Sequence, residues 1–163
     1  GAAAFAQGGI DMACGFGGGL RRMKENGNVL LTGAEKEELG ILVFDVTSSP
    51  AGFVAENSDL VAKFLKITAN ANAMWADESK RAEMLPVIAK DSGMDEAAAA
   101  DSLATFSFPT TEEQLSAKWL GGGVQTFMKG VADVFVTAGS IPAALDNYDA
   151  QVNTGPLTTA DGM

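Results

Sequence analysis

The sequence contains no histidine and a single cysteine, and each shortage argues against a class of chemistry. Without histidine, the chain lacks the commonest general base and the commonest metal ligand at neutral pH. The lone Cys14 cannot form a disulfide within the chain, and a thiol in an apolar segment is typical of a small core residue rather than a nucleophile. We therefore expect neither a bound metal nor a cofactor.

Positive charge is also scarce, because 11 Lys and Arg stand against 21 Asp and Glu, a net charge of −10. Nucleic-acid binding needs basic patches, so this balance argues against that partner, and it disfavours anionic membrane surfaces too. No apolar run is long enough to cross a bilayer, so we expect no direct membrane insertion. The 163 residues are otherwise rich in apolar side chains and suffice for one domain with a good core.

The most informative stretch is the apolar, β-branched run 40–49, which predicts a β-strand. Alternation places Ile41, Val43, Asp45 and Thr47 on one face and apolar side chains on the other. A carboxylate on a covered strand is costly unless a cation or several hydrogen-bond donors meet it. Two interpretations stay open: Asp45 bonds to backbone donors or a nearby Lys, or it meets the cation of a ligand.

A glycine triplet at 17–19 follows a short predicted strand over 10–16 and opens a helix over 20–25. The triplet is either a tight turn or a place where a ligand approaches helix-start N–H groups, which favour sulfonate or carboxylate. It is not a phosphate-binding loop, because the GxxxxGK[ST] pattern is absent.

The remaining pattern predicts an α/β protein whose front third is βαβ-like and whose rest is mostly helical. Further strands are expected at 28–32 and, after Pro50, at 51–55. A helix from Ser58 is expected to bury one stripe, and the capping box Thr110-x-x-Glu113 starts another. Further helices are expected over 1–8, 78–89 with an interruption at Pro86, 95–103 and 124–137. The front third has too few strands to close a sheet and leaves unpaired edges, so we expect part of the protein to lie outside this chain.

The order and spacing of many weak motifs resemble the C-terminal half of a known family. These motifs are Gly9-Ile10-Asp11-Met12-Ala13-Cys14-Gly15-Phe16, Asn26-Gly27-Asn28-Val29-Leu30-Leu31-Thr32, Phe44-Asp45-Val46, Val61-Ala62-Lys63-Phe64, Ile141-Pro142 and Asn147-Tyr148. The family comprises the periplasmic substrate-binding proteins that serve ABC transporters for taurine and other sulfonates, with relatives for nitrate. The resemblance covers nearly all of residues 3–153.

The resemblance implies an incomplete type II periplasmic binding protein fold. Residues 1–43 would belong to the far lobe, 44–50 to a hinge crossing, 51–153 to the C-terminal part of the first lobe, and 154–163 to a loose tail. It also implies a receptor for a small organic sulfonate such as taurine, or for a similar zwitterion or anion. Such a receptor is periplasmic or lipid-anchored, and its partners would be an ABC permease and the N-terminal half of the same protein.

The resemblance further assigns ligand-binding residues. Phe16 corresponds to an aromatic residue of the pocket, Gly17 and Gly18 to the turn beside it, and Asp45 to a carboxylate that receives the ligand ammonium. Four residues depart from the family pattern: a Trp is usual at Phe16, an Ala-Pro at Gly17-Gly18 and a Trp at Thr47. These departures imply a roomier or more polar pocket and leave the identity of the ligand open.

Two other functions fit the same resemblance. Pyrimidine-forming enzymes of the thiamin pathway share the implied fold, but they use histidine and cysteine, and the absence of histidine argues against an enzyme. A periplasmic sensor would use the same binding role for signalling rather than import, and the sequence does not separate it from a receptor.

Overall fold

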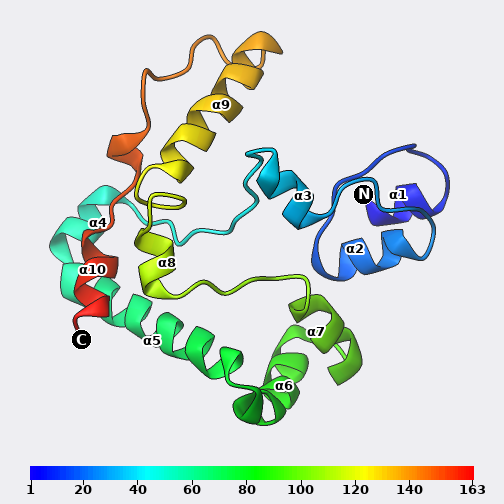
Figure 1. The fold of residues 1–163 in the computed structure, drawn as a ribbon, viewed down its shortest axis with the longest axis horizontal. Coiled ribbons are helices and arrows are strands. Elements are labelled where there is room, and N and C mark those ends of the chain that lie inside the picture. The colour runs from blue at the N-terminus through cyan, green and yellow to red at the C-terminus, as the bar shows by residue number, and fades with distance from the viewer. The chain divides into compact units, whose positions relative to one another are not determined.

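The computed structural model describes residues 1–163, and all of its regular structure is helical (Figure 1). The helices are α1 (Ala2–Ala6), α2 (Gly17–Lys24), α3 (Gly33–Glu38), α4 (Ala51–Glu56), α5 (Ser58–Ala76), α6 (Glu78–Ser92), α7 (Glu96–Leu103), α8 (Thr111–Leu115), α9 (Gly123–Thr137), the 3-10 helix η1 (Asp149–Gln151) and α10 (Gly155–Asp161). No helix combines the length and the apolar character that crossing a membrane requires.

The expected α/β class is therefore wrong, and the chain does not form the βαβ part of a type II binding protein fold. The segments 10–16, 28–32 and 41–50 contain neither helix nor strand, and the expected strand 51–55 lies in α4. A strand exists only where a second segment exchanges ladder hydrogen bonds with it. None of these apolar runs pairs with another, so β-propensity alone does not produce a sheet.

Local capping signals at Asp95 and Thr110 placed two helices correctly. Asp95 caps α7 by accepting a hydrogen bond from the Ala98 backbone N–H, and Asp77, which the sequence analysis did not identify, caps α6 in a similar way through Ser79. The predicted capping box at the start of α8 is confirmed, since Thr110 and Glu113 exchange side-chain and backbone hydrogen bonds. The expected interruption at Pro86 is wrong, because α6 continues through that residue to Ser92.

The first of two compact units comprises residues 1–32 and 73–108. In it α2 packs against α1 and α7, and α6 packs against α7. Small side chains make these contacts close: Ala89 is 3% exposed and Ala99 is 2% exposed. Gly27 lies close to α1, because a Cβ there would be 2.6 Å from the ring of Phe5 and the ring would have to shift.

The second unit comprises residues 33–72 and 109–163. Helix α10 lies against α8 and buries Pro156, Leu157 and Ala160, so the tail that the sequence predicted to be loose contains an ordered helix. Phe44 packs edge-on against Trp119 and Phe127, with ring centroids 6.2 and 5.9 Å away. This aromatic cluster holds the segment 41–50 to the unit.

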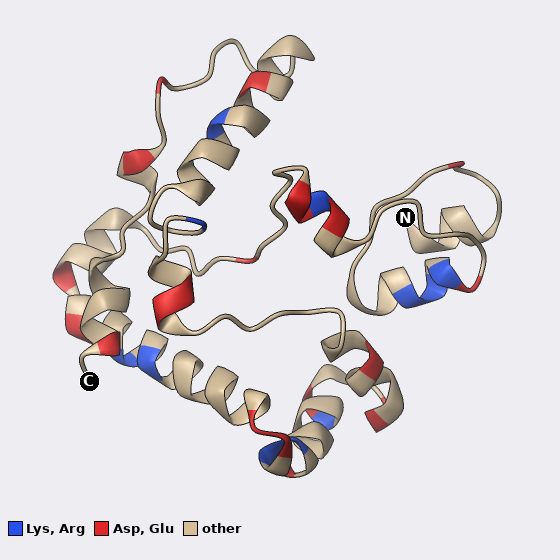
Figure 2. Ribbon diagram, viewed as in Figure 1, with Lys and Arg blue, Asp and Glu red and all other residues tan.

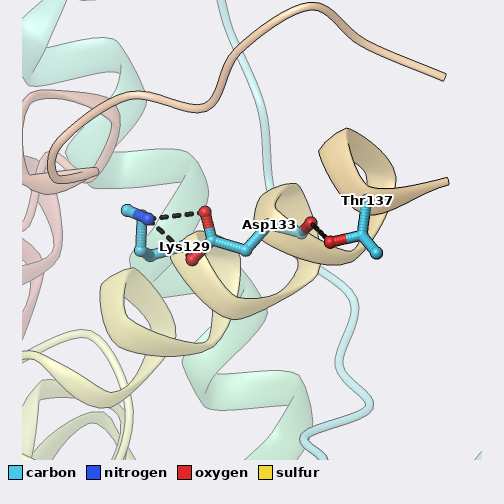
Figure 3. A network of polar contacts seen from close by, with 3 residues as sticks. All are labelled: Lys129, Asp133 and Thr137. Atoms are coloured by element: carbon cyan, nitrogen blue, oxygen red, sulfur yellow. Dashed lines mark hydrogen bonds and ion pairs between the residues drawn. The ribbon is translucent and has the colours of Figure 1, made fainter. Parts of the chain in front are cut away.

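Helix α9 exposes a network of polar side chains, and helix α5 exposes a stripe of apolar ones. On α9, Lys129 Nζ contacts both carboxylate oxygens of Asp133 at 2.6 Å, and the Thr137 hydroxyl donates to the Asp133 carbonyl (Figure 3). On α5, the stripe that the sequence predicted to be buried is exposed. Its members are Leu60, Phe64, Ile67, Ala71 and Met74. The buried side of α5 is instead marked by Ala62, which is fully covered.

Candidate functional site

The residues that the sequence singled out occur in both units. Phe16, 70% exposed, directly precedes α2, where Gly17 and Gly18 are the first two residues. Gly17 has a φ of +53°, a conformation that favours glycine. Asp45 and Thr47 lie in the second unit, in the segment without helix or strand, where both are exposed and their side chains make no hydrogen bond or ion pair. Their roles in ligand binding stay predictions.

A cavity of about 460 Å³ in the first unit combines one cation with apolar walls. It lies where the end of α5, helix α6 and helix α7 meet. Its lining residues are Trp75, Arg81, Ala82, Leu85, Ala100, Leu103, Ala104 and Phe106. Arg81, Ala82, Ala104 and Phe106 are exposed, so the cavity is an open depression. Its lining is mostly apolar with one polar group that can orient a ligand, as in small-molecule sites.

The cap of α6 brings Trp75 and Arg81 together. Asp77 accepts hydrogen bonds from the Ser79 hydroxyl at 2.7 Å and from the Ser79 backbone N–H at 2.9 Å. These two bonds, the hydroxyl bond first, lower the pKa of the Asp77 carboxyl below its ordinary value. The capped turn leads directly from α5 into the first turn of α6, where Arg81 lies beside Trp75 at the end of α5.

The guanidinium of Arg81 is held at two points. Its Nε donates a hydrogen bond of 2.6 Å to the Trp75 carbonyl, and its Cζ lies 5.5 Å from the centroid of the Trp75 ring, within cation–π range. The two terminal nitrogens of Arg81 have no hydrogen bond or ion pair. A guanidinium presents its donors as a planar fork that matches the oxygens of carboxylate, phosphate or sulfonate groups. Arg81 is therefore oriented by the protein and still free to bind an anion.

The remaining walls favour a compact organic ligand. Three alanines, Ala82, Ala100 and Ala104, leave space between α6 and α7, while the leucines and Phe106 provide apolar surface. The cavity lining includes no carboxylate that would neutralise Arg81 or repel an anion. This arrangement suits a ligand with an anionic head at the guanidinium and a short apolar body against the aromatic rings.

A second cavity, of about 660 Å³, lies in the second unit and has the opposite charge. It is lined by Ser49, Ala51, Val54, Ala55, Ser58, Asp59, Asp149, Ala150, Gln151, Val152, Asn153, Gly155, Pro156 and Thr159. Its charged groups are the carboxylates of Asp59 and Asp149, and no Lys or Arg is among the lining residues. An anionic head would be repelled there, so the smaller cavity is the better candidate for the expected class of ligand.

No group of three or more Cys, Asp and Glu side chains is placed to hold a metal ion. Cys14 is free and exposed, which differs from the core position that its apolar neighbours predicted. Figure 2 shows how sparsely the basic residues are distributed among the acidic ones along the chain. None of the three arginines forms a salt bridge, and Arg81 is the one that lines a cavity.

The sequence analysis did not identify Arg81, and it interpreted Trp75 as a core residue. One local signal was available, because Asp77-x-Ser79 is a helix cap that follows one apolar helix and starts another. Such a cap predicts a tight connection, across which Trp75 and Arg81 become neighbours. The contact of α6 with α7, which completes the cavity, has no comparable local signal.

Comparison of the chain with protein-family models, with curated proteins and with solved structures found no match. The functional argument therefore depends on the residues of the two cavities and on the sequence resemblance described above.

Proposed function

We propose that this chain is a solute-binding receptor for a small organic sulfonate or a related anion. The observation that supports the proposal is the unpaired Arg81 guanidinium, fixed by the Trp75 carbonyl and ring at a cavity with apolar walls. The resemblance of residues 3–153 to sulfonate-binding receptors points to the same class of ligand. In this role the chain serves an ABC permease, and its location is periplasmic.

The chemistry of the cavity explains how such a ligand is chosen. A sulfonate offers three oxygens to the free donors of Arg81, and charge-assisted hydrogen bonds of this kind contribute about 1.5–3 kcal/mol each. The carbon chain next to the sulfur contacts Trp75 and Phe106, which favours organic sulfonates over sulfate. Binding here needs no proton transfer, so the proposal involves no catalytic step.

Calorimetric titration with ethanesulfonate and 2-aminoethanesulfonate tests the role of Arg81. We expect Arg81→Gln to weaken binding of both ligands about tenfold or more, because each loses its charged partner. Arg81→Lys should recover only part of the affinity, since an ammonium keeps the charge but loses the planar fork. Arg21→Gln is the matched control, because Arg21 lies exposed on α2 of the same unit and outside the cavity.

If Arg81→Gln and Arg21→Gln weaken sulfonate binding equally, the affinity depends on the net charge of the chain and not on the position of Arg81. Unchanged affinity in Arg81→Gln would show that the sulfonate does not bind in the Arg81 cavity. Uptake of labelled sulfonate by cells that carry or lack the protein then tests its role with a permease. Uptake that does not depend on the protein would contradict the receptor role while leaving the binding result intact.

A further inference from the structure

The segment 42–49 of the second unit leaves its backbone without hydrogen bonds. None of its N–H or C=O groups bonds to another backbone group, and no side chain bonds to them. The last bond before it is from Ile41 N to the Lys36 carbonyl, and the first after it is accepted by the Pro50 carbonyl. In Figure 1 this stretch is the ribbon without helix between α3 and α4.

The side chains of the same segment alternate in exposure at its start. Leu42 and Phe44 are half-buried, and Phe44 is anchored by the rings of Trp119 and Phe127. Between and beside them, Ile41 is 43% exposed and Val43 is 67% exposed. This period of two is the pattern of a strand with one face packed. The start of the segment is thus anchored on one side by Phe44, while Ile41 and Val43 are exposed and the backbone groups make no hydrogen bonds.

An apolar, β-branched segment with unpaired backbone groups is a template for pairing with another strand. Extended peptides bind to such templates through main-chain hydrogen bonds, and alternate side chains provide specificity. Proteins usually protect an exposed edge with lysine, proline or a covering element. Here proline occurs only at the end, at Pro50, and no basic residue lies between 41 and 50.

The charge of Asp45 determines which partner strand can pair with this segment. Its carboxylate has no ion pair or hydrogen bond, and Val43 and Val46 nearby are both more than half exposed. A strand laid over these side chains would remove water from the carboxylate, so it must bring a cation. A second copy of the chain does not, because self-pairing brings further acidic residues and a second net charge of −10. Opposite charges facing each other across two strands are favourable, whereas like charges are unfavourable.

We propose that residues 41–47 are a strand-addition site for an apolar, extended segment of a partner polypeptide, with a Lys or Arg facing Asp45. The proposal is independent of the Arg81 cavity, which lies in the other unit. It assigns to this segment a protein partner rather than a small ligand. The backbone provides most of the affinity, and Asp45 provides the selection.

Hydrogen exchange of the intact chain with a synthetic peptide tests this site. The probe is acetyl-Thr-Val-Val-Val-Lys-Val-Thr-amide, and we expect it to slow exchange of the amides of residues 42–48 at least about tenfold at saturation. The matched peptide with Glu in place of Lys should bind up to about fivefold more weakly. A third peptide, N-methylated at alternate residues, cannot form the ladder and should not protect these amides.

A charge reversal makes the test sharper. In Asp45→Lys the preference should switch from the Lys peptide to the Glu peptide, while the N-methylated peptide still fails. The proposal is wrong if the N-methylated peptide protects 42–48 equally well, or if protection appears only elsewhere in the chain. It is also wrong if neither peptide binds, or if sedimentation shows that the chain pairs with a second copy through this segment instead.

Discussion

At the scale of single residues, alanine provides much of the close packing in this chain. Ala62 is fully buried, Ala160 is 1% exposed, and no large side chain is buried to the same degree. Because a covered Cβ leaves no room for further atoms, positions of this kind are sensitive to added volume. The apolar side chains that the sequence made prominent, such as Ile67 and Val43, are more exposed than these alanines.

We expect Ala62→Leu to destabilise the second unit by about 1–3 kcal/mol, because the added methyl groups overpack a filled position. Ala71→Leu is the control, since Ala71 lies on the exposed face of the same helix. That change should alter the free energy of unfolding by less than about 0.5 kcal/mol. Denaturant midpoints of the two variants measure the difference, and equal midpoints would show that Ala62 is not in a tightly packed position.

A second prediction at this scale concerns the capping box of α8. The backbone hydrogen bond from Thr110, followed by the bond from its hydroxyl, lowers the pKa of Glu113, with a smaller effect of Lys118. Because the folded pKa is below the unfolded one, the contribution to stability is present above the unfolded pKa. It is lost as the pH falls through the folded pKa.

Thr110→Val removes the hydroxyl and keeps the backbone N–H, so the pKa of Glu113 should rise part of the way to its ordinary value. Carboxyl titration followed by NMR measures this shift, with Glu112 of the same helix as the internal reference. A Glu113 pKa that is the same in both proteins would mean that the hydroxyl bond does not form in solution.

At the scale of elements, α6 contains a proline in its interior and still continues for a further turn and a half. Pro86 has no N–H to donate to the Ala82 carbonyl, and its ring crowds that carbonyl. The helix persists because it is capped at Asp77, ended by Gly93 with a φ of +69°, and packed against α7. The caps and the packing against α7 together stabilise α6 by more than Pro86 destabilises it.

Pro86→Ala should therefore raise the free energy of unfolding, by up to about 3 kcal/mol, since it restores one helical hydrogen bond. The greater freedom of alanine in the unfolded chain offsets part of this gain. Gly93→Ala is the opposing control and should lower stability, because that position is left-handed. Thermal unfolding compares both with the parent protein, and a less stable Pro86→Ala variant would contradict this account of α6.

The elements also show what the sequence was able to predict. Helices with a cap within their own few residues, such as those after Asp95 and Thr110, were placed correctly because the signal is local. The run 41–47 was placed as a strand from its composition, yet a strand depends on a partner that propensity does not provide. The cavity at Arg81 was missed for a related reason: its cap and the Trp75 contact are local, but the wall that completes it comes from the packing of α6 against α7.

At the scale of the whole molecule, the charges that line the two cavities decide which of them suits an anionic ligand. The chain has a net charge of −10, and the larger cavity carries two carboxylates, so most of the molecule is unfavourable for anions. The Arg81 cavity differs, because its lining combines one cation with apolar residues and contains no carboxylate. The central claim is that a small organic sulfonate binds there, against Trp75.

Trp75 provides the most direct test, because the chain has only two tryptophans. In Trp119→Phe the emission comes from Trp75 alone, and the substitution keeps an aromatic ring beside Phe44. The account predicts that 2-aminoethanesulfonate changes this emission in a saturable way, and that the change disappears when Arg81→Gln is added. An identical titration curve with and without Arg81, or no change of Trp75 emission at concentrations where calorimetry shows binding, would contradict it.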